Sequence, residues 1–296
     1  MTGTGPRDGG CGVDARRLAA VARRVGVVGA GSFVAPALRL RLERAGHVVE
    51  AVSSRGGAPD DVAAASLTSA VSLCPIWGLV DRLPHLAARG VRRLVAVSST
   101  SRHSKASSPD AGERAVAERL ATAEEAVGRW AEVHGARVTI LRPTLVYDGV
   151  HDRNVTTIAA FIRRTGWFPL VGAGRGLRQP LHADDLAACC VAALEAADAR
   201  ACYDVSGGET LAYREMVCRI FAAAGLPPRF VRVPRWAVRV ALPAVSWLLR
   251  RRDISLAAFD RMDESLVFDH APAAHDLGFA PRVFRPSLTG GSRGGS

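Results

Sequence analysis

The stretch that decides the fold is Val25-Gly26-Val27-Val28-Gly29-Ala30-Gly31-Ser32-Phe33-Val34-Ala35. Its first four residues predict a buried strand, which breaks at a glycine-rich turn. Residues 36–46 follow with a helical pattern that ends at Gly46, and a second apolar run spans Val48 to Val52. Strand, tight glycine turn, helix and strand form the first unit of a dinucleotide-binding domain, because the turn offers backbone N–H groups to a pyrophosphate. The alternative is an ordinary βα turn of another α/β protein, since a lone glycine motif is weak evidence.

Further βα units follow along the chain. Apolar runs at residues 70–77, 93–97 and 138–141 predict buried strands, with helices at 79–89 and 110–132 between them and a polar loop at 102–109. This alternation predicts an α/β fold with a Rossmann-type, doubly wound parallel sheet. The interval from residue 53 to 69 is close to the lower limit for a crossover with its helix, so we expect this part of the sheet to be abbreviated.

The composition is that of a globular protein. A chain of 296 residues with 48% hydrophobic and 23% charged residues can form one large domain or two closely packed ones. No apolar run reaches the roughly 20 residues that span a bilayer, and residues 1–24 lack the apolar core of a secretory signal. The six cysteines have no CxxC pair and no metal-ligand spacing. We therefore expect a cytoplasmic protein without a metal.

The net charge of +11 raises the question of nucleic-acid binding. Lys105 is the only lysine, so almost all of the basic residues are arginines, and these are scattered rather than gathered in a stripe. We expect no nucleic-acid partner. Small molecules that carry phosphate are a better match, because the arginine fork fits phosphate oxygens.

The residues after the second strand bear on the choice of cofactor. Ser54 and Arg55 stand where NAD-binding proteins usually place an acid for the ribose 2′-OH, and an arginine can accommodate the 2′-phosphate of NADP. This favours NADP(H) over NAD(H). The alternative is an arginine in a solvated turn.

Five segments together resemble the NAD-dependent epimerase/dehydratase family, the extended branch of the short-chain dehydrogenase/reductase superfamily. The opening stretch is similar to that family's GxxGxxG turn, and the other segments are residues 98–100, 142–147, 181–187 and 276–281. The resemblance runs from about residue 25 to 286. It implies a dinucleotide-binding core (24–150, with 182–205 returning to it) and a substrate lobe (151–181 and 206–287). The composition of the two ends predicts a flexible leader (1–23) and a disordered tail (288–296).

The resemblance also implies the positions of a cofactor site and a substrate site. The cofactor positions are Gly29, Gly31, Ser32, Phe33, Val34, Ser54, Arg55, Cys74, Pro75, Ser98, Pro143 and Thr144. Members of the family bind nucleotide sugars in the lobe, and Arg153, Arg175 and Arg178 are suitable partners for a pyrophosphate. Each of these arginines can equally be a solvated surface residue.

The departures from the family pattern concern the chemistry. Ser32 and Ala35 replace two glycines of the turn. Family enzymes carry a Tyr-x-x-x-Lys pair on the helix after the Ser/Thr strand, whereas residues 113–130 contain neither tyrosine nor lysine. The candidate positions hold Val116 and Leu120, or Ala117 and Ala121. The usual acid/base pair is therefore absent.

Two residues are candidates for the remaining chemistry. Thr100 matches the catalytic Ser/Thr of the family and would bind a substrate oxygen, or it only caps the strand end. His103 is a candidate proton carrier because histidine titrates near neutral pH, or it is a solvated loop residue.

Two functions are consistent with these observations. One is an oxidoreductase that transfers a hydride to or from a nucleotide sugar or a related carbonyl compound, with a non-standard acid/base. The other is a cofactor-binding protein without turnover, which serves as a structural or assembly subunit or as a redox sensor. Residues 236–252 are apolar with arginines at both ends. We expect this segment to pack against the lobe or against a partner subunit, such as a second copy in a homodimer. The alternative is contact with a membrane surface.

Overall fold

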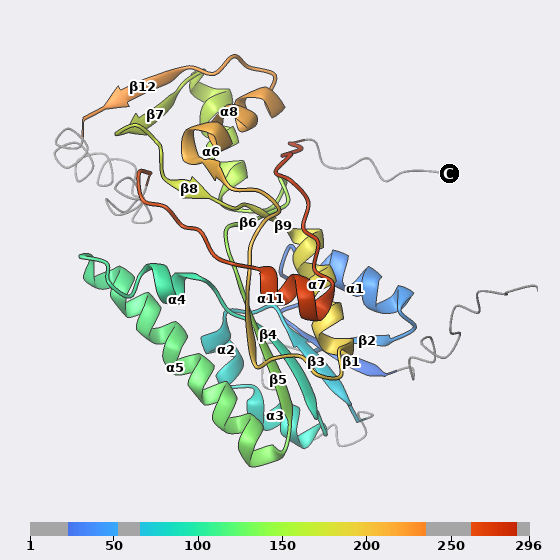
Figure 1. Ribbon diagram of the computed structural model, residues 1–296. Coiled ribbons are helices and arrows are strands. Elements are labelled where there is room, and N and C mark those ends of the chain that lie inside the picture. The colour runs from blue at the N-terminus through green and yellow to red at the C-terminus, as the bar shows by residue number, and fades with distance from the viewer. Residues whose placement is uncertain (1–22, 53–65, 235–261, 289–296) are drawn as a thin grey trace, which may run out of the picture.

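The computed structural model describes residues 23–52, 66–234 and 262–288. Their centre is a six-stranded, fully parallel sheet with the strand order β10-β5-β4-β3-β1-β2 (Figure 1). The strands are β1 (Arg24–Val28), β2 (Val48–Val52), β3 (Ser69–Ser72), β4 (Arg93–Val97), β5 (Arg137–Pro143) and β10 (Cys202–Val205). The strand order reverses beside β1, and the predicted Rossmann-type fold class is confirmed.

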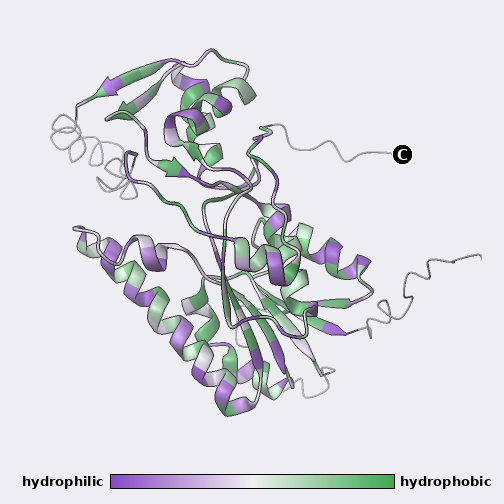
Figure 2. Ribbon diagram, viewed as in Figure 1, coloured by the Kyte–Doolittle hydropathy of each residue, from purple (hydrophilic) through white to green (hydrophobic). Residues whose placement is uncertain are grey.

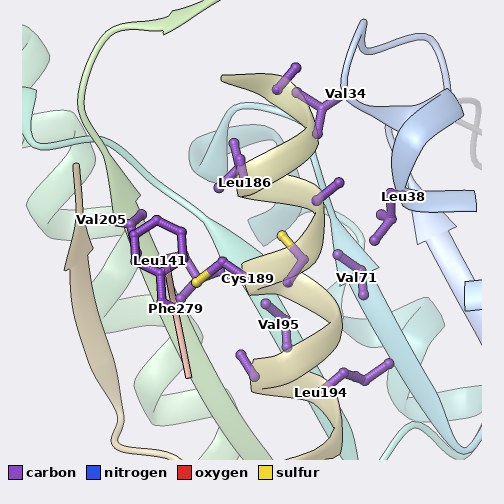
Figure 3. Packing of buried hydrophobic residues seen from close by; sticks show 14 of the residues in the cluster. Val34, Leu38, Val71, Val95, Leu141, Leu186, Cys189, Leu194, Val205 and Phe279 are labelled. Atoms are coloured by element: carbon purple, nitrogen blue, oxygen red, sulfur yellow. The ribbon is translucent and has the colours of Figure 1, made fainter. Parts of the chain in front are cut away.

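Helices cover both faces of the sheet. On one face, α1 (Ala35–Arg44) and α7 (Ala183–Glu195) pack on the strands, with α11 (Ala271–Leu277) beside α7 (Figure 1). Figure 3 shows this core, whose buried side chains include Leu38, Val71, Val95, Leu186, Cys189 and Leu194. Burial raises the pKa of Cys189 to about 12, so this thiol is a small hydrophobic residue of the core.

The other face is covered by α2 (Ile76–Val80), α3 (Leu83–Ala88) and α5 (Ala111–His134). Asp110 caps α5 by accepting a hydrogen bond from the Glu113 N–H at 2.9 Å, and Gly135 ends the helix in the left-handed conformation. Hydrophobic and hydrophilic residues alternate along this helix in Figure 2, and its buried stripe includes Leu120, Val127 and Trp130. Local capping and the apolar stripe together explain why this helix forms where the sequence predicts it.

The rest of the chain builds a smaller lobe at the carboxyl ends of the strands. It contains α6 (Val155–Thr165), α8 (Tyr213–Ala223) and two strand pairs, β7 (Phe168–Val171) with β12 (Phe230–Val233) and β8 (Leu177–Arg178) with β11 (Leu211–Ala212). A separate hydrophobic cluster fills this lobe. A short pair, β6 (Val146–Tyr147) with β9 (Leu181–His182), lies where the chain passes between the sheet and the lobe (Figure 1).

Three local predictions are wrong. The strand predicted at 70–77 ends at Ser72, and the helix predicted at 79–89 is divided into α2 and α3. Ile76 and Leu79 are both buried, which is the spacing of one helical turn, and Pro84 favours a new start by occupying the first turn of α3. The loop predicted at 102–109 begins with a helical turn, α4 (Ser101–Ser104).

Several predicted features lie outside the described residues: the leader up to residue 22, the cofactor residues Ser54 and Arg55, the segment 236–252 and the tail from residue 289. Within the described ranges, no helix has the length and apolar character needed to cross a membrane. The cytoplasmic location stays a prediction.

Replacing Gly29 by alanine is expected to destabilise the fold. Gly29 has φ +81°, and a Cβ there would lie 2.6 Å from the backbone nitrogen of Cys74. Both the strained backbone and the overlap oppose the methyl group, so we expect Gly29→Ala to lower the free energy of unfolding by about 1–3 kcal/mol in urea titrations. Gly31→Ala is the matched control, because nothing lies within 4 Å of a Cβ at that position. Equal stability of the two variants would contradict this account of the turn.

Candidate cofactor site

A cavity of about 900 Å³ lies at the carboxyl edge of the sheet, between the glycine turn and the lobe. The core lines it with residues at the ends of four strands: Ser32, Phe33 and Val34 after β1, Leu73 after β3, Ser98 to Thr100 after β4, and Pro143 and Thr144 at the end of β5. The lobe contributes residues of α6, β7, β8 and α8. Parallel sheets bind ligands at this edge, where the strand order reverses.

The glycine turn brings the start of α1 to the cavity. The Ser32 N–H donates to the Gly29 carbonyl at 2.9 Å, and the Ala35 N–H donates to the Ser32 carbonyl at 2.9 Å. The two glycine replacements are accommodated, since the Ser32 hydroxyl accepts the Val34 N–H at 3.3 Å and the Ala35 methyl group is buried. No side chain from outside the turn caps α1, but the Ala35 N–H is used within the turn and Pro36 has no N–H. The turn has the place in the fold where a dinucleotide binds, with few free N–H donors in the first turn of the helix.

Two hydroxyl groups of the cavity wall have partners within the protein. Thr100 is only 6% exposed, and its hydroxyl donates to the Pro143 carbonyl at 3.1 Å. The Thr144 hydroxyl donates to the Gln179 carbonyl at 2.5 Å. Thr100 thus lines the cavity at the predicted place, but its hydroxyl joins the end of β4 to the end of β5.

A buried ion cluster lies behind this wall. Glu124 of α5 is 4% exposed and accepts hydrogen bonds from the Ser98 hydroxyl at 2.5 Å, from Arg142 at 2.6 Å and from Arg102. Burial opposes the charge of this carboxylate, but the hydrogen bonds from Arg142 and Ser98 outweigh it and hold the pKa of Glu124 below its usual value. The cluster joins β4, α4, α5 and β5 beneath the cavity.

His103 belongs to the edge of this cluster. Its Nε2 lies 3.8 Å from Asp204 Oδ1 on β10, and Arg142 approaches the same oxygen to 3.9 Å. Burial raises the pKa of Asp204. His103 is not among the residues that line the cavity, so its position gives no support to the prediction of a proton carrier.

The helix that carries the Tyr-x-x-x-Lys pair in family enzymes is set back from the cavity. Leu120 is buried in the core beneath the sheet, Val116 packs against the same cluster, and none of the residues 111–134 lines the cavity. The ionisable side chains among the described lining residues are Lys105, Arg153, Arg178 and Tyr213. Burial raises the pKa of Tyr213 to about 12, so this phenol stays protonated at neutral pH.

The predicted site residues divide into three groups. The cavity is lined by Ser32, Phe33, Val34, Ser98, Thr100, Pro143, Thr144, Arg153 and Arg178. The residues that are described but do not line it are Gly29, Gly31, Cys74, Pro75, His103 and Arg175. Ser54 and Arg55 lie outside the described residues.

Sequence reasoning missed two ionisable residues of the wall, Lys105 and Tyr213. Lys105 lies 3.7 Å from Glu113 at the start of α5. The signal for Lys105 was present, because a single lysine in an arginine-rich chain is unusual. Nothing in the sequence marks Tyr213, which comes to the cavity only through the packing of α8.

Comparisons with known proteins agree with this architecture. The sequence model of the NAD dependent epimerase/dehydratase family matches residues 77–205. The chain is similar to this family over these residues. The predicted resemblance is therefore confirmed, with the match covering the second half of the sheet and the first part of the lobe.

Solved structures of similar fold include proteins in complex with NADPH or NAD. RMD from Pseudomonas aeruginosa, complexed with NADPH, has a TM-score of 0.66 and 18% identity over 90% of this chain and 96% of that chain. UDP-glucuronic acid 4-epimerase from Bacillus cereus, in complex with NAD, has a TM-score of 0.63 and 12% identity over 90% of this chain and 96% of that one. At these identities the likeness shows the shared fold.

A sequence relative comes from Arabidopsis thaliana. NADH dehydrogenase (ubiquinone) 1 alpha subcomplex subunit 9, mitochondrial, is 30% identical over 158 residues. The match covers 50% of this chain and 39% of that protein. The chain thus spans about two fifths of the length of this curated relative.

The ion cluster predicts a pH-dependent contribution to stability. We expect Glu124→Gln to lower the free energy of unfolding at pH 7 by about 3 kcal/mol, because Arg142 then keeps no full counter-charge in a buried position. The pKa of Glu124 is depressed, so its contribution is complete above the usual value of 4.5 and is lost as the pH falls through the lower folded value.

The measurement is urea unfolding of wild type and Glu124→Gln between pH 3 and pH 7. The difference between the two proteins should shrink below about pH 4.5. Glu118→Gln, at an exposed position of the same helix, is the control and should stay close to wild type throughout. A difference that does not change with pH would argue against a charged Glu124.

Proposed function

We propose that this chain binds NADP(H) in the cavity and holds it without hydride transfer, as a structural or assembly subunit. The observation that carries the proposal is the lining of the cavity. Its described part contains no histidine, cysteine, aspartate or glutamate, and its one tyrosine has a pKa of about 12. A general acid or base works best with a pKa near the operating pH. The two lining groups that could pass a proton are Tyr213, whose pKa lies far above neutral, and Lys105, which lies 3.7 Å from Glu113.

Cofactor binding rests on the glycine turn and the strand ends. The turn residues Ser32, Phe33 and Val34 would hold the pyrophosphate, and Ser98, Pro143 and Thr144 would border the nicotinamide end. The nicotinamide, when bound, supplies a hydride donor or acceptor. The protein's own contribution is to bind the cofactor and to exclude water. Arg55 favours NADP(H), as the sequence predicts.

A structural role is supported by the Arabidopsis relative, which by its name is a subunit of a mitochondrial NADH dehydrogenase. A bound dinucleotide that is not consumed stabilises the folded state by mass action. It would thereby favour the form of the chain that a partner recognises. A redox sensor is a variant of the same proposal, in which the bound cofactor's redox state changes the stability of the complex.

A second candidate function is hydride transfer to or from a nucleotide sugar or a related carbonyl compound. The continuity of the cavity from the turn into the lobe favours it, because a cofactor and a substrate can lie end to end there. The exposed Arg153 would meet the anionic part of such a substrate. This candidate requires Tyr213 or Lys105 to act as the proton donor, in place of the Tyr-x-x-x-Lys pair of the family.

The binding test is a fluorescence titration of the full chain with NADPH and with NADH. We expect NADPH to bind at least tenfold more tightly, and we expect Ser32→Glu to weaken NADPH binding at least tenfold because its carboxylate faces the pyrophosphate. Thr122→Glu adds the same charge on the exposed side of α5 and should bind like wild type. If neither nucleotide binds, the proposal fails.

The turnover test uses the same NADPH-loaded protein. UDP-sugars and dTDP-sugars are added, and the absorbance of NADPH and the sugar products are followed over several hours. We expect unchanged absorbance and unchanged sugars. Oxidation of the cofactor coupled to a sugar product would replace this proposal with the second candidate.

Thr100→Val distinguishes a structural from a chemical role of the hydroxyl. Because the hydroxyl donates to the Pro143 carbonyl, its loss should lower the free energy of unfolding by about 1 kcal/mol. The NADPH dissociation constant should stay within about twofold. A tenfold weaker affinity for NADPH with unchanged stability would show that this hydroxyl binds the cofactor instead.

A further inference from the structure

The half of the cavity that lies in the lobe has an apolar wall. Ile158 and Phe161 come from α6, Phe168 from β7 and Met216 from α8, and Met262 and Phe268 come from the returning C-terminal segment. Apart from the first residue, Met216 and Met262 are the only methionines of the chain. Methionine adapts its shape to irregular apolar ligands, so their joint presence in one wall favours a ligand with a flexible hydrocarbon part.

The polar groups of this half already have partners. Arg178 is buried, its guanidinium donates to the carbonyls of Leu177 at 2.8 Å and Glu264 at 2.6 Å, and it lies over the Tyr213 ring. The side-chain oxygen of Gln179 accepts the Phe268 N–H at 2.7 Å. A sugar diphosphate buried against this wall would lose hydration without gaining donors in return, which is unfavourable.

The exposed polar side chains of this half are found where α6 begins. Arg153 and Asn154 come just before α6, and Thr157 is in its first turn; all three are exposed and line the cavity, whereas Ile158 and Phe161 further along the helix are half-buried. The wall therefore changes from cationic and polar to apolar along a single helix. Such a gradient matches a molecule with an anionic head and a hydrocarbon tail.

We propose that the lobe half of the cavity binds a fatty acid or fatty acyl group, with the alkyl chain against Ile158, Phe161 and Met216 and the carboxyl end at Arg153. This inference rests on the proposed function in one respect: the dinucleotide occupies the half of the cavity beside the glycine turn. It replaces the nucleotide sugar as the second ligand. Fatty acid and acyl ester share the chain and differ in the charge of the head.

The test is a titration of the full chain with cis-parinaric acid, whose fluorescence rises in an apolar site. We expect saturable binding of one molecule, displacement by oleate and no displacement by UDP-glucose. Ile158→Glu should weaken binding at least tenfold, because it places a carboxylate beside the alkyl chain. Ala160→Glu, on the exposed face of the same helix, is the matched control and should bind like wild type.

The head group is tested separately. Arg153→Gln should weaken the binding of oleate several-fold and leave methyl oleate unchanged. If the wild type binds oleate and methyl oleate equally well, and Arg153→Gln changes neither affinity, the assignment of the carboxyl end to Arg153 is overturned.

The NADPH titration separates this inference from the proposed function. Ile158→Glu should bind NADPH like wild type, which also shows that the variant is folded, and Ile158→Ser is the milder substitute if it is not. Binding of NADPH without saturable binding of cis-parinaric acid would overturn this inference alone. Binding of the fatty acid without NADPH would overturn the proposed function alone, and displacement by UDP-glucose would restore the nucleotide sugar.

Discussion

The close approach of the first turn to the end of β3 is the constraint on which the rest of the structure depends. At Gly29 the backbone turns with φ +81° directly against Cys74, and only a residue without a side chain fits there. This contact lets β1 and β3 pair in parallel and directs the start of α1 toward the cavity. Ser32 and Ala35 stand where the family has glycine. Glycine is not required at these two positions, because both side chains are accommodated within the turn.

In the proposed function, the chain keeps the part of the fold that binds a dinucleotide and differs from the family in the part that carries the Tyr-x-x-x-Lys pair. On the reacting side, Leu120 is part of the core, and Glu124 is held by Ser98, Arg102 and Arg142 in a buried ion cluster. A buried cluster of this kind fixes the relative positions of the elements it joins more than it adds to net stability. A rigid edge beside the cavity is suited to holding a ligand in one position.

The sequence predicts the sheet and the turn well because both depend on local patterns. The apolar runs of β1, β4 and β5 and the capped helix α5 are visible from their neighbours along the chain, and so are the segments that place Ser98 and Pro143 at the cavity. Pro84 marks the start of the second helix within residues 76–88, but which apolar residues of the first helix meet the sheet is not visible in the sequence. The same holds for Tyr213, the pairing of Glu124 with Arg142, and the apolar wall of the lobe, which arise from contacts between distant segments.

The central claim is that the cavity edge binds a dinucleotide that the chain does not turn over. The most direct measurement is an electron-density map of crystals of the chain grown with NADPH. The account predicts an intact nucleotide with its pyrophosphate at the backbone of Ser32 to Val34 and with the Thr100 hydroxyl still bonded to the Pro143 carbonyl. A map without nucleotide at this turn, or with the Thr100 hydroxyl turned onto the ligand, would contradict it.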